Sequence, residues 1–290
     1  MTSFEERHYR SKDGLSLFYR DYPHASSLTP VLCIPGLTRN SRDFDFIAGH
    51  IAQTRRVLTA DLRGRGRSAH DPNPRNYSVP VETSDMLQLV ATLDLPKVIV
   101  LGTSRGGVIA MMMATFSPGR VAGAILNDMG AELEAAGLER IYAVMRTPPS
   151  FASWEEATEA LERNNRDHFP NVSQERWREF ARALYREDAG RIAGNYDPNF
   201  PRAILEGSGT NPRTDSGAAD LWKWFGALQN VPTLLLRGEN SELLSAQAAL
   251  RMKAEKNDLA AVTVKDRGHV PFLDEPEAVE AIDAFLAGIQ

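Results

Sequence analysis

The segment VIVLGTSRGGVIAMMM contains a serine in a setting suited to nucleophilic catalysis. Its central residues, Gly102-Thr103-Ser104-Arg105-Gly106, fit the pattern G-x-S-x-G between a β-like run and an apolar helical run. A serine on such a sharp turn raises its hydroxyl above the sheet, and the two glycines leave room for the turn. Amides at the start of the following helix favour developing negative charge. We therefore expect Ser104 to be a nucleophile rather than only a helix-capping residue.

A serine hydroxyl needs a neighbouring base, and His269 is the best-placed of the six histidines. It follows the last predicted strand in RGHVPFLDEPE, where a loop should bring it over the carboxyl edge of the sheet. None of the other five histidines follows a core strand so directly. We expect His269 to be the base and the others to be catalytically inert.

Acyl transfer also requires N–H donors for an oxyanion. The backbone amide of Arg105, directly after the serine, is the first candidate. The turn in IPGLTRNS supplies the second, the amide of Leu37. The alternative interpretation is that this turn only joins a strand to a helix.

Short β-like runs alternate with helical runs along most of the chain, which predicts a mostly parallel sheet with helices on both faces. The first two runs read as a hairpin through Lys12-Asp13-Gly14. The expected strands are 4–10, 15–21, 30–35, 56–61, 98–102, 121–126, 233–236 and 261–264, and the clearest helices are 41–53, 81–93, 108–116 and 276–289.

Residues 130–220 interrupt this alternation with helical pieces and no convincing buried strand. We expect a helical cap there, inserted into a core formed by residues 1–129 and 221–290. The segment has eleven arginines and sixteen acidic residues. Because both signs are mixed, a solvated surface is favoured over a binding site for acidic substrates.

The composition restricts the other classes of function. The net charge of -5 with interspersed signs argues against nucleic acid as a partner. Cys33 is the single cysteine, and the longest nearly apolar run, 107–116, is too short to span a bilayer. The N-terminal residues lack the apolar stretch of a signal peptide, so we expect a cytoplasmic protein without membrane association. Neither a metal-binding nor a nucleotide-binding motif is present, so no cofactor is expected.

Taken in order, the motifs IPGLTRNSRDF, DLRGRGRS, LGTSRGG, LLLRGENSELLS and RGHVPFLDEPE resemble those of α/β-hydrolase-fold serine hydrolases. The likeness covers essentially the whole chain and is greatest for the branch of esterases, lactonases and carbon–carbon bond hydrolases. It implies an eight-stranded sheet with a cap after the sixth strand and a triad in the order Ser, acid, His.

The acid of the triad has two candidates. The resemblance implies a carboxylate after the seventh strand, where this chain has Glu242 instead of the usual aspartate. We expect Glu242 to orient His269 and Glu239 to face solvent. Asp128, after the strand 121–126, is the alternative acid, although we expect it to pair with Arg105 at the ends of neighbouring strands.

The expected activity is cleavage of a carboxylic ester or lactone through an acyl-serine intermediate. Cleavage of a carbon–carbon bond in a vinylogous diketone is an alternative, since it uses the same triad. A non-catalytic ligand receptor on the same fold is the alternative from another class. The expected partner is a small-molecule ester or lactone, with the protein a monomer or homodimer. The sequence does not distinguish among these bonds or set the size of the acyl group.

Overall fold

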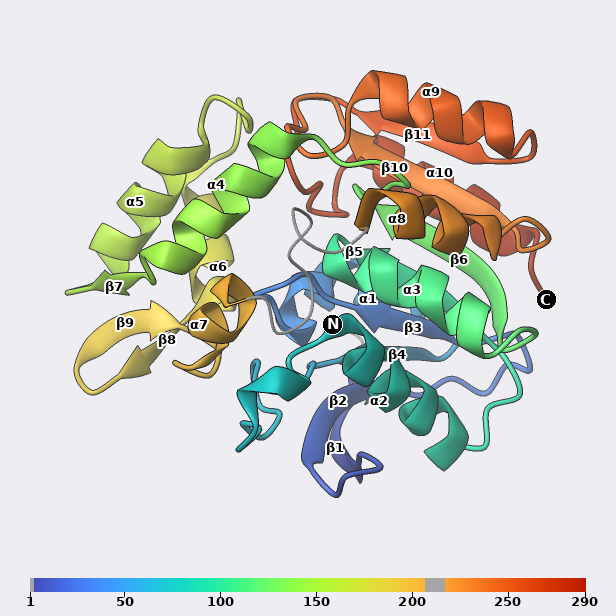
Figure 1. Ribbon diagram of the computed structural model, residues 1–290, viewed down its shortest axis with the longest axis horizontal. Coiled ribbons are helices and arrows are strands. Elements are labelled where there is room, and N and C mark those ends of the chain that lie inside the picture. Colours follow the sequence, from blue (N-terminus) through green and yellow to red (C-terminus); the bar gives the residue numbers. More distant parts are fainter. Residues whose placement is uncertain (1–2, 207–216) are drawn as a thin grey trace.

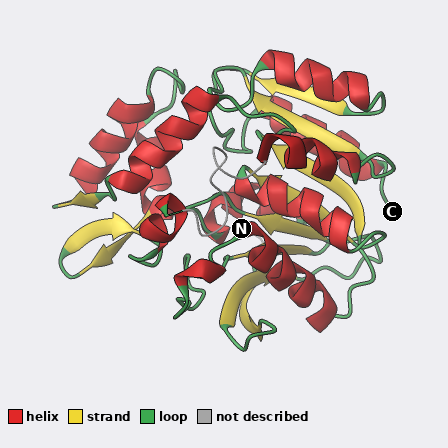
Figure 2. Cartoon of the chain, in the orientation of Figure 1, coloured by secondary structure: helices red, strands yellow, loops and turns green. Residues whose placement is uncertain are grey.

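A central eight-stranded sheet carries helices on both faces in the computed structural model, which describes residues 3–206 and 217–290 (Figures 1 and 2). The strand order is β1-β2-β4-β3-β5-β6-β10-β11. The bounds are β1 (Glu5–Arg10), β2 (Ser16–Tyr22), β3 (Val31–Ile34), β4 (Val57–Ala60), β5 (Val98–Thr103), β6 (Val121–Asn127), β10 (Thr233–Gly238) and β11 (Ala260–Val264).

Strand β2 runs antiparallel to both of its neighbours, β1 and β4, whereas β4, β3, β5, β6, β10 and β11 pair in parallel. The predicted mostly parallel sheet is therefore confirmed. The predicted opening hairpin is also present, with Glu5 opposite Asp21 and Arg10 opposite Ser16.

Two apolar clusters cover the two faces of the sheet. One contains buried side chains of α2, α3, α8 and α9, and the other contains those of α1 and α10. Parallel strands buried on both faces are accordingly apolar along most of their length, as in β5, whose six residues are all buried and end in Thr103. The helices are α1 (Asp45–Ile51), α2 (Val79–Thr92), α3 (Arg105–Phe116), α8 (Gly217–Gly226), α9 (Ala246–Glu255) and α10 (Pro276–Ala287), with short 3₁₀ helices η1 (Ser41–Phe44) and η2 (Pro74–Asn76).

The chain between β6 and α8 forms an insertion that is not purely helical, in contrast to the prediction. It contains a small antiparallel sheet of order β7-β9-β8. The sequence does not reveal these strands because β7 has only two residues and β8 has no buried residue. The insertion comprises α4 (Ala135–Arg146), β7 (Ser150–Phe151), α5 (Trp154–Asn165), α6 (Gln174–Leu184), β8 (Tyr185–Asp188), β9 (Arg191–Gly194) and α7 (Phe200–Leu205).

Two features locate this insertion relative to the core. It lies on the left of Figure 1, and it contacts loops that follow strands of the main sheet. Asn40 Nδ2 donates to Ala183 O at 2.8 Å, and Gly66 N donates to Asn195 O at 2.9 Å. The expected boundary at residue 220 falls within α8, whose Leu221 and Phe225 belong to a core cluster. A division at that point would therefore cut a helix of the core.

None of the helices in the described part of the chain combines the length and apolar character needed to cross a bilayer.

We expect Gly106→Ala to destabilise the fold, because its Cβ would lie 2.0 Å from Ile34 O. Relief requires α3 to move away from β3, and such overpacking costs about 1–3 kcal/mol. Gly226→Ala is the matched control, since a Cβ at Gly226 would meet nothing within 4 Å. Urea unfolding measures both variants, and equal free energies of unfolding would contradict the argument.

Candidate active site

Ser104 lies on a strained turn between β5 and α3. Its backbone has φ 50° and ψ -116°, in the positive-φ region that side chains other than glycine rarely occupy. Two contacts stabilise the turn: Ser104 N donates to Asn127 O at 3.0 Å, and Gly107 N donates to Ser104 O at 2.8 Å. The hydroxyl of Ser104 lies at the carboxyl edge of the sheet. Because Ser104 is only 9% exposed, this hydroxyl is shielded from bulk water.

His269 joins the serine to a buried carboxylate. Its Nε2 lies 2.8 Å from Ser104 Oγ, and its Nδ1 lies 2.7 Å from Asp128 Oδ2. An ionised carboxylate only accepts hydrogen bonds, so the tautomer with hydrogen on Nδ1 fits this arrangement. Nε2 is then free to accept the hydroxyl hydrogen of Ser104. This geometry allows the imidazole to act as a base toward the serine.

Asp128, and not Glu242, contacts His269. The residue follows β6 directly and is fully buried. Besides His269, its carboxylate accepts from Gly238 N at 2.8 Å and from Ser241 Oγ at 2.5 Å. Ser241 is a partner that the sequence analysis did not identify, since a serine in a loop carries no distinguishing signal. The loop after β10 thus supplies donors for the acid instead of the acid itself.

Glu242 turns toward the insertion. It forms an ion pair with Arg140 Nη1 on α4, and its Oε1 lies 3.3 Å from His168 Nε2. Its side chain is 37% exposed. The expectation that Glu242 orients His269 is therefore wrong. Ser241, and not Glu242, occupies the inward position of this loop. Glu239 is exposed, as expected.

Arg105 does not pair with Asp128, in contrast to the expectation. Its Nε lies 2.6 Å from Glu82 Oε2 on α2, and its Nη2 donates to Tyr77 O at 3.2 Å. The Arg105 side chain is 6% exposed and Glu82 is fully buried. Glu82 was not identified from the sequence because α2 has the pattern of an ordinary amphipathic helix. In such a helix a single acidic residue is expected to face solvent.

The turn after β3 lies directly beside the serine. A Cβ placed on Gly36 would be 3.7 Å from Ser104 Cβ. The carbonyl of Leu37 accepts a hydrogen bond from Arg65 Nε at 2.9 Å, which holds the peptide between Leu37 and Thr38, adjacent to the Leu37 amide. Arg105 begins α3, where the amides of the first turn point toward the N-terminal end of the helix. Both expected oxyanion donors therefore belong to segments that border Ser104.

The loop that carries His269 is packed against the insertion. Phe272 stacks on Phe169 with ring centroids 5.3 Å apart, and it meets Phe180 at 4.9 Å. Trp177 completes this buried apolar cluster. The loop is held between the core and the insertion in this way.

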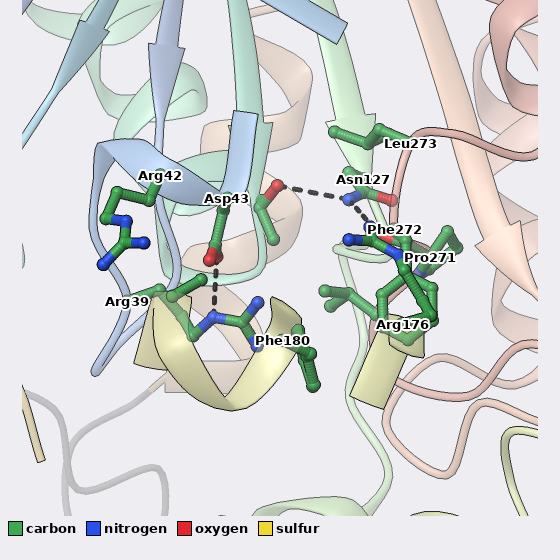
Figure 3. Close-up of a pocket in the computed structure, with 12 residues that line it drawn as sticks. Arg39, Arg42, Asp43, Asn127, Arg176, Phe180, Pro271, Phe272 and Leu273 are labelled. Carbon is green, nitrogen blue, oxygen red and sulfur yellow. Dashed lines mark hydrogen bonds and ion pairs between the residues drawn. The ribbon is translucent and has the colours of Figure 1, made fainter. Parts of the chain in front are cut away.

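A small cavity opens between η1, α6 and the loop after His269 (Figure 3). Its inner wall includes Thr103 and Asn127, at the ends of β5 and β6. In Figure 3, Arg39 with Asp43 and Arg176 with Phe272 flank it from opposite sides. Arg39 Nε lies 2.6 Å from Asp43 Oδ2, and burial raises the pKa of Asp43 even though the Arg39 guanidinium opposes it. The outer part of the cavity is rich in guanidinium groups.

Among residues 3–206 and 217–290, no group of three His, Cys, Asp or Glu side chains could hold a metal ion.

Comparison with known proteins identifies relatives over the full length of the fold. Residues 29–276 match the family model described as alpha/beta hydrolase fold. The 3-hydroxybutyrate-oligomer hydrolase of Cupriavidus necator is 32% identical, with 93% of this chain and 92% of that protein covered. The pimeloyl-[acyl-carrier protein] methyl ester esterase of Nitrosospira multiformis is 29% identical, with 82% and 84% covered. The crystal structure of an alpha/beta hydrolase from Novosphingobium aromaticivorans is 38% identical, with a TM-score of 0.92 and 100% of both chains covered.

The two carboxylates can be compared through their effects on ester turnover. We expect Asp128→Asn to lower kcat by about 10⁴-fold, because an amide lets His269 take the wrong tautomer. Glu242→Gln should stay within about threefold of wild type, since it removes only a half-exposed ion pair. Initial rates with a p-nitrophenyl ester measure both, and circular dichroism checks their folding. The opposite ranking would return the orienting role to Glu242.

Proposed function

The chain belongs to the α/β-hydrolase fold family, and from this premise we propose that it is a serine hydrolase that cleaves a carboxylic ester or lactone through an acyl-serine intermediate. The observation that carries the proposal is the position of His269, in contact with both Ser104 and Asp128. Its relatives are named as a hydrolase and as a methyl ester esterase, in agreement with an enzyme that hydrolyses ester bonds.

In the first half-reaction, Ser104 Oγ attacks the carbonyl carbon of the ester while His269 Nε2 takes the hydroxyl proton. Asp128 stabilises the resulting imidazolium through Nδ1. The negative charge moves to the carbonyl oxygen, where the amides of Leu37 and Arg105 would receive it. Collapse of this tetrahedral intermediate breaks the bond to the alcohol, which leaves with the proton from Nε2.

In the second half-reaction, water attacks the acyl-serine carbonyl and gives a proton to the same nitrogen. The bond to Ser104 Oγ then breaks and the oxygen regains its proton, releasing the carboxylic acid. In a lactone both products are one molecule, so the same steps open the ring. The insertion would act as a cap that shields these steps, since its aromatic cluster packs on the loop carrying His269.

An intact contact between Ser104 and His269 favours an enzyme over a ligand receptor. We expect Ser104→Ala to fold normally and to lose nearly all ester turnover, because the acyl group then has no attachment point. His269→Ala should lose labelling by a fluorophosphonate as well, because the serine is no longer activated. Mass spectrometry of the labelled protein, together with turnover of p-nitrophenyl esters, provides the measurement. Unchanged turnover in purified Ser104→Ala would refute the mechanism.

We also propose that the guanidinium-rich cavity receives a free carboxylate at one end of the substrate. The cavity reaches Thr103, the residue before the nucleophile. Arg176 Nη2 is paired with Asp274 at 2.7 Å, but its buried Nε has no hydrogen-bond acceptor within the described residues. Arg42 donates to a backbone carbonyl, that of Arg182, so a carboxylate does not offset its charge at this contact. An anionic group entering here would gain charge-assisted hydrogen bonds.

The carboxylate preference is tested with a hydroxy-acid ester dimer and the methyl ester of that dimer. We expect kcat/KM to be about tenfold higher for the free acid, a difference of about 1.4 kcal/mol. Arg176→Gln should reduce only the rate with the free acid. Arg178→Gln is the matched control, because Arg178 is exposed on the same helix and does not line the cavity. Equal kcat/KM values for the two esters in the wild type would exclude the proposal.

A further inference from the structure

Three charged side chains form a buried cluster beneath the candidate oxyanion site. Glu82 lies between two guanidinium groups, with Oε1 2.7 Å from Arg65 Nη1 and Oε2 2.6 Å from Arg105 Nε. Arg65 and Glu82 are fully buried, and the Arg105 side chain is 6% exposed. The three residues come from the turn after β4, the first turn of α2 and the first residue of α3. Three segments distant in sequence thus meet at a single carboxylate.

Each guanidinium belongs to, or holds, one of the two residues whose amides are the candidate oxyanion donors. Arg105 is the residue whose own amide follows the nucleophile. Arg65 Nε donates to Leu37 O at 2.9 Å, so it holds the carbonyl of the residue whose amide is the second candidate donor. The guanidinium of Arg65 also lies over the ring of Phe200, 4.0 Å from its centroid. A displacement of either guanidinium would therefore move a candidate oxyanion donor.

We infer that Glu82 is a positioning residue that sets the distance between the two oxyanion donors by holding Arg65 and Arg105 together. This inference rests on the proposed serine hydrolase function. The Glu82 carboxylate lies between two buried positive charges. Without it, the guanidinium groups of Arg65 and Arg105 would repel each other in a medium of low dielectric constant. Catalysis is sensitive to this separation, because an oxyanion donor must lie at hydrogen-bond distance from the developing charge.

The electrostatic environment keeps the cluster charged. Burial raises the pKa of Glu82, but the guanidiniums of Arg105 and Arg65 outweigh this effect, and the net shift is downward. Burial lowers the pKa of Arg65 to about 10. Glu82 and Arg65 consequently carry their charges near neutral pH, and the contacts within the cluster act as ion pairs.

A neighbouring cluster provides a matched control. Asp85 lies one turn further along α2 and is also buried, with Oδ1 2.6 Å from Arg63 Nη2. The other carboxylates on Arg63 are those of Asp13, at 2.9 Å, and Asp71. This cluster ties the opening hairpin to α2, and the backbone carbonyl of Arg63, which accepts from Arg65 Nη1 at 2.6 Å, links it to the Glu82 cluster. Loss of Asp85 removes a buried ion pair of the same kind but leaves the Glu82 carboxylate between Arg65 and Arg105 in place.

The test compares Glu82→Gln with Asp85→Asn in the full-length protein. We expect Glu82→Gln to lower kcat for a p-nitrophenyl ester by about 10²-fold, the effect of losing one oxyanion donor, with KM changed by less than about threefold. The inhibition constant of a trifluoromethyl ketone, which forms an oxyanion on the serine, should rise in proportion to the loss of kcat/KM. Asp85→Asn should keep near wild-type values of both, even where its melting temperature falls equally.

If Glu82→Gln does not fold, Arg65→Lys replaces it. A lysine keeps the positive charge but lacks the fork needed to hold Glu82 and Leu37 O together, so the same kinetic pattern is expected. Wild-type kcat in Glu82→Gln or Arg65→Lys, or an equal loss of kcat in Asp85→Asn, would overturn the inference. Ser104→Ala separates the two proposals. If it is inactive while Glu82→Gln is fully active, the positioning role fails and the serine mechanism stands.

Discussion

The site depends on the close approach of α3 to β3 at Gly106. The backbone oxygen of Ile34 occupies the space that a side chain at Gly106 would need, and Gly102 faces the backbone of Gly106 in the same way. This approach permits the chain to reverse over a single residue, Ser104, with positive φ. A residue in that region costs about 1–3 kcal/mol and persists only where its surroundings determine it. The buried strands β3, β5 and β6 supply those surroundings, so the hydroxyl is presented by a fully packed part of the core.

The location of the acid follows from the order of the strands. Since β6 lies between β5 and β10, a carboxylate at its end is next to the serine turn on one side and the loop after β10 on the other. Asp128 takes this central position, and the β10 loop provides Gly238 N and Ser241 Oγ to satisfy its oxygens. A buried carboxylate needs such donors, because an unpaired one would be costly to ionise. Glu242 takes no part in this arrangement and forms its ion pair with the insertion instead.

Features tied to strand ends were predictable from the sequence, and features that depend on side-chain direction were not. Ser104 and His269 could be found because Ser104 follows β5 directly and His269 lies in the loop after β11, the last strand, and the alternation of elements predicts the sheet. The choice between Asp128 and Glu242 could not be made, since both lie at the same edge and only the loop conformation decides which one turns inward. Glu82 was missed because its burial arises from segments that meet only in the folded chain. The strands β7 to β9 were missed because they are short and only two of their residues, both in β9, are buried.

The insertion contacts both sides of the candidate site but leaves Ser104, the proposed nucleophile, to the core. On the side of the base, Phe169 packs on Phe272 in the loop that carries His269. On the side of the proposed oxyanion donors, Phe200 packs on Arg65, which holds the carbonyl of Leu37. Ser104, by contrast, is fixed by β5, β6 and α3, all elements of the main sheet and its covering helices. Changes within the insertion can therefore alter the enclosure of a substrate and the alignment of its two flanking groups, while the serine turn keeps its geometry.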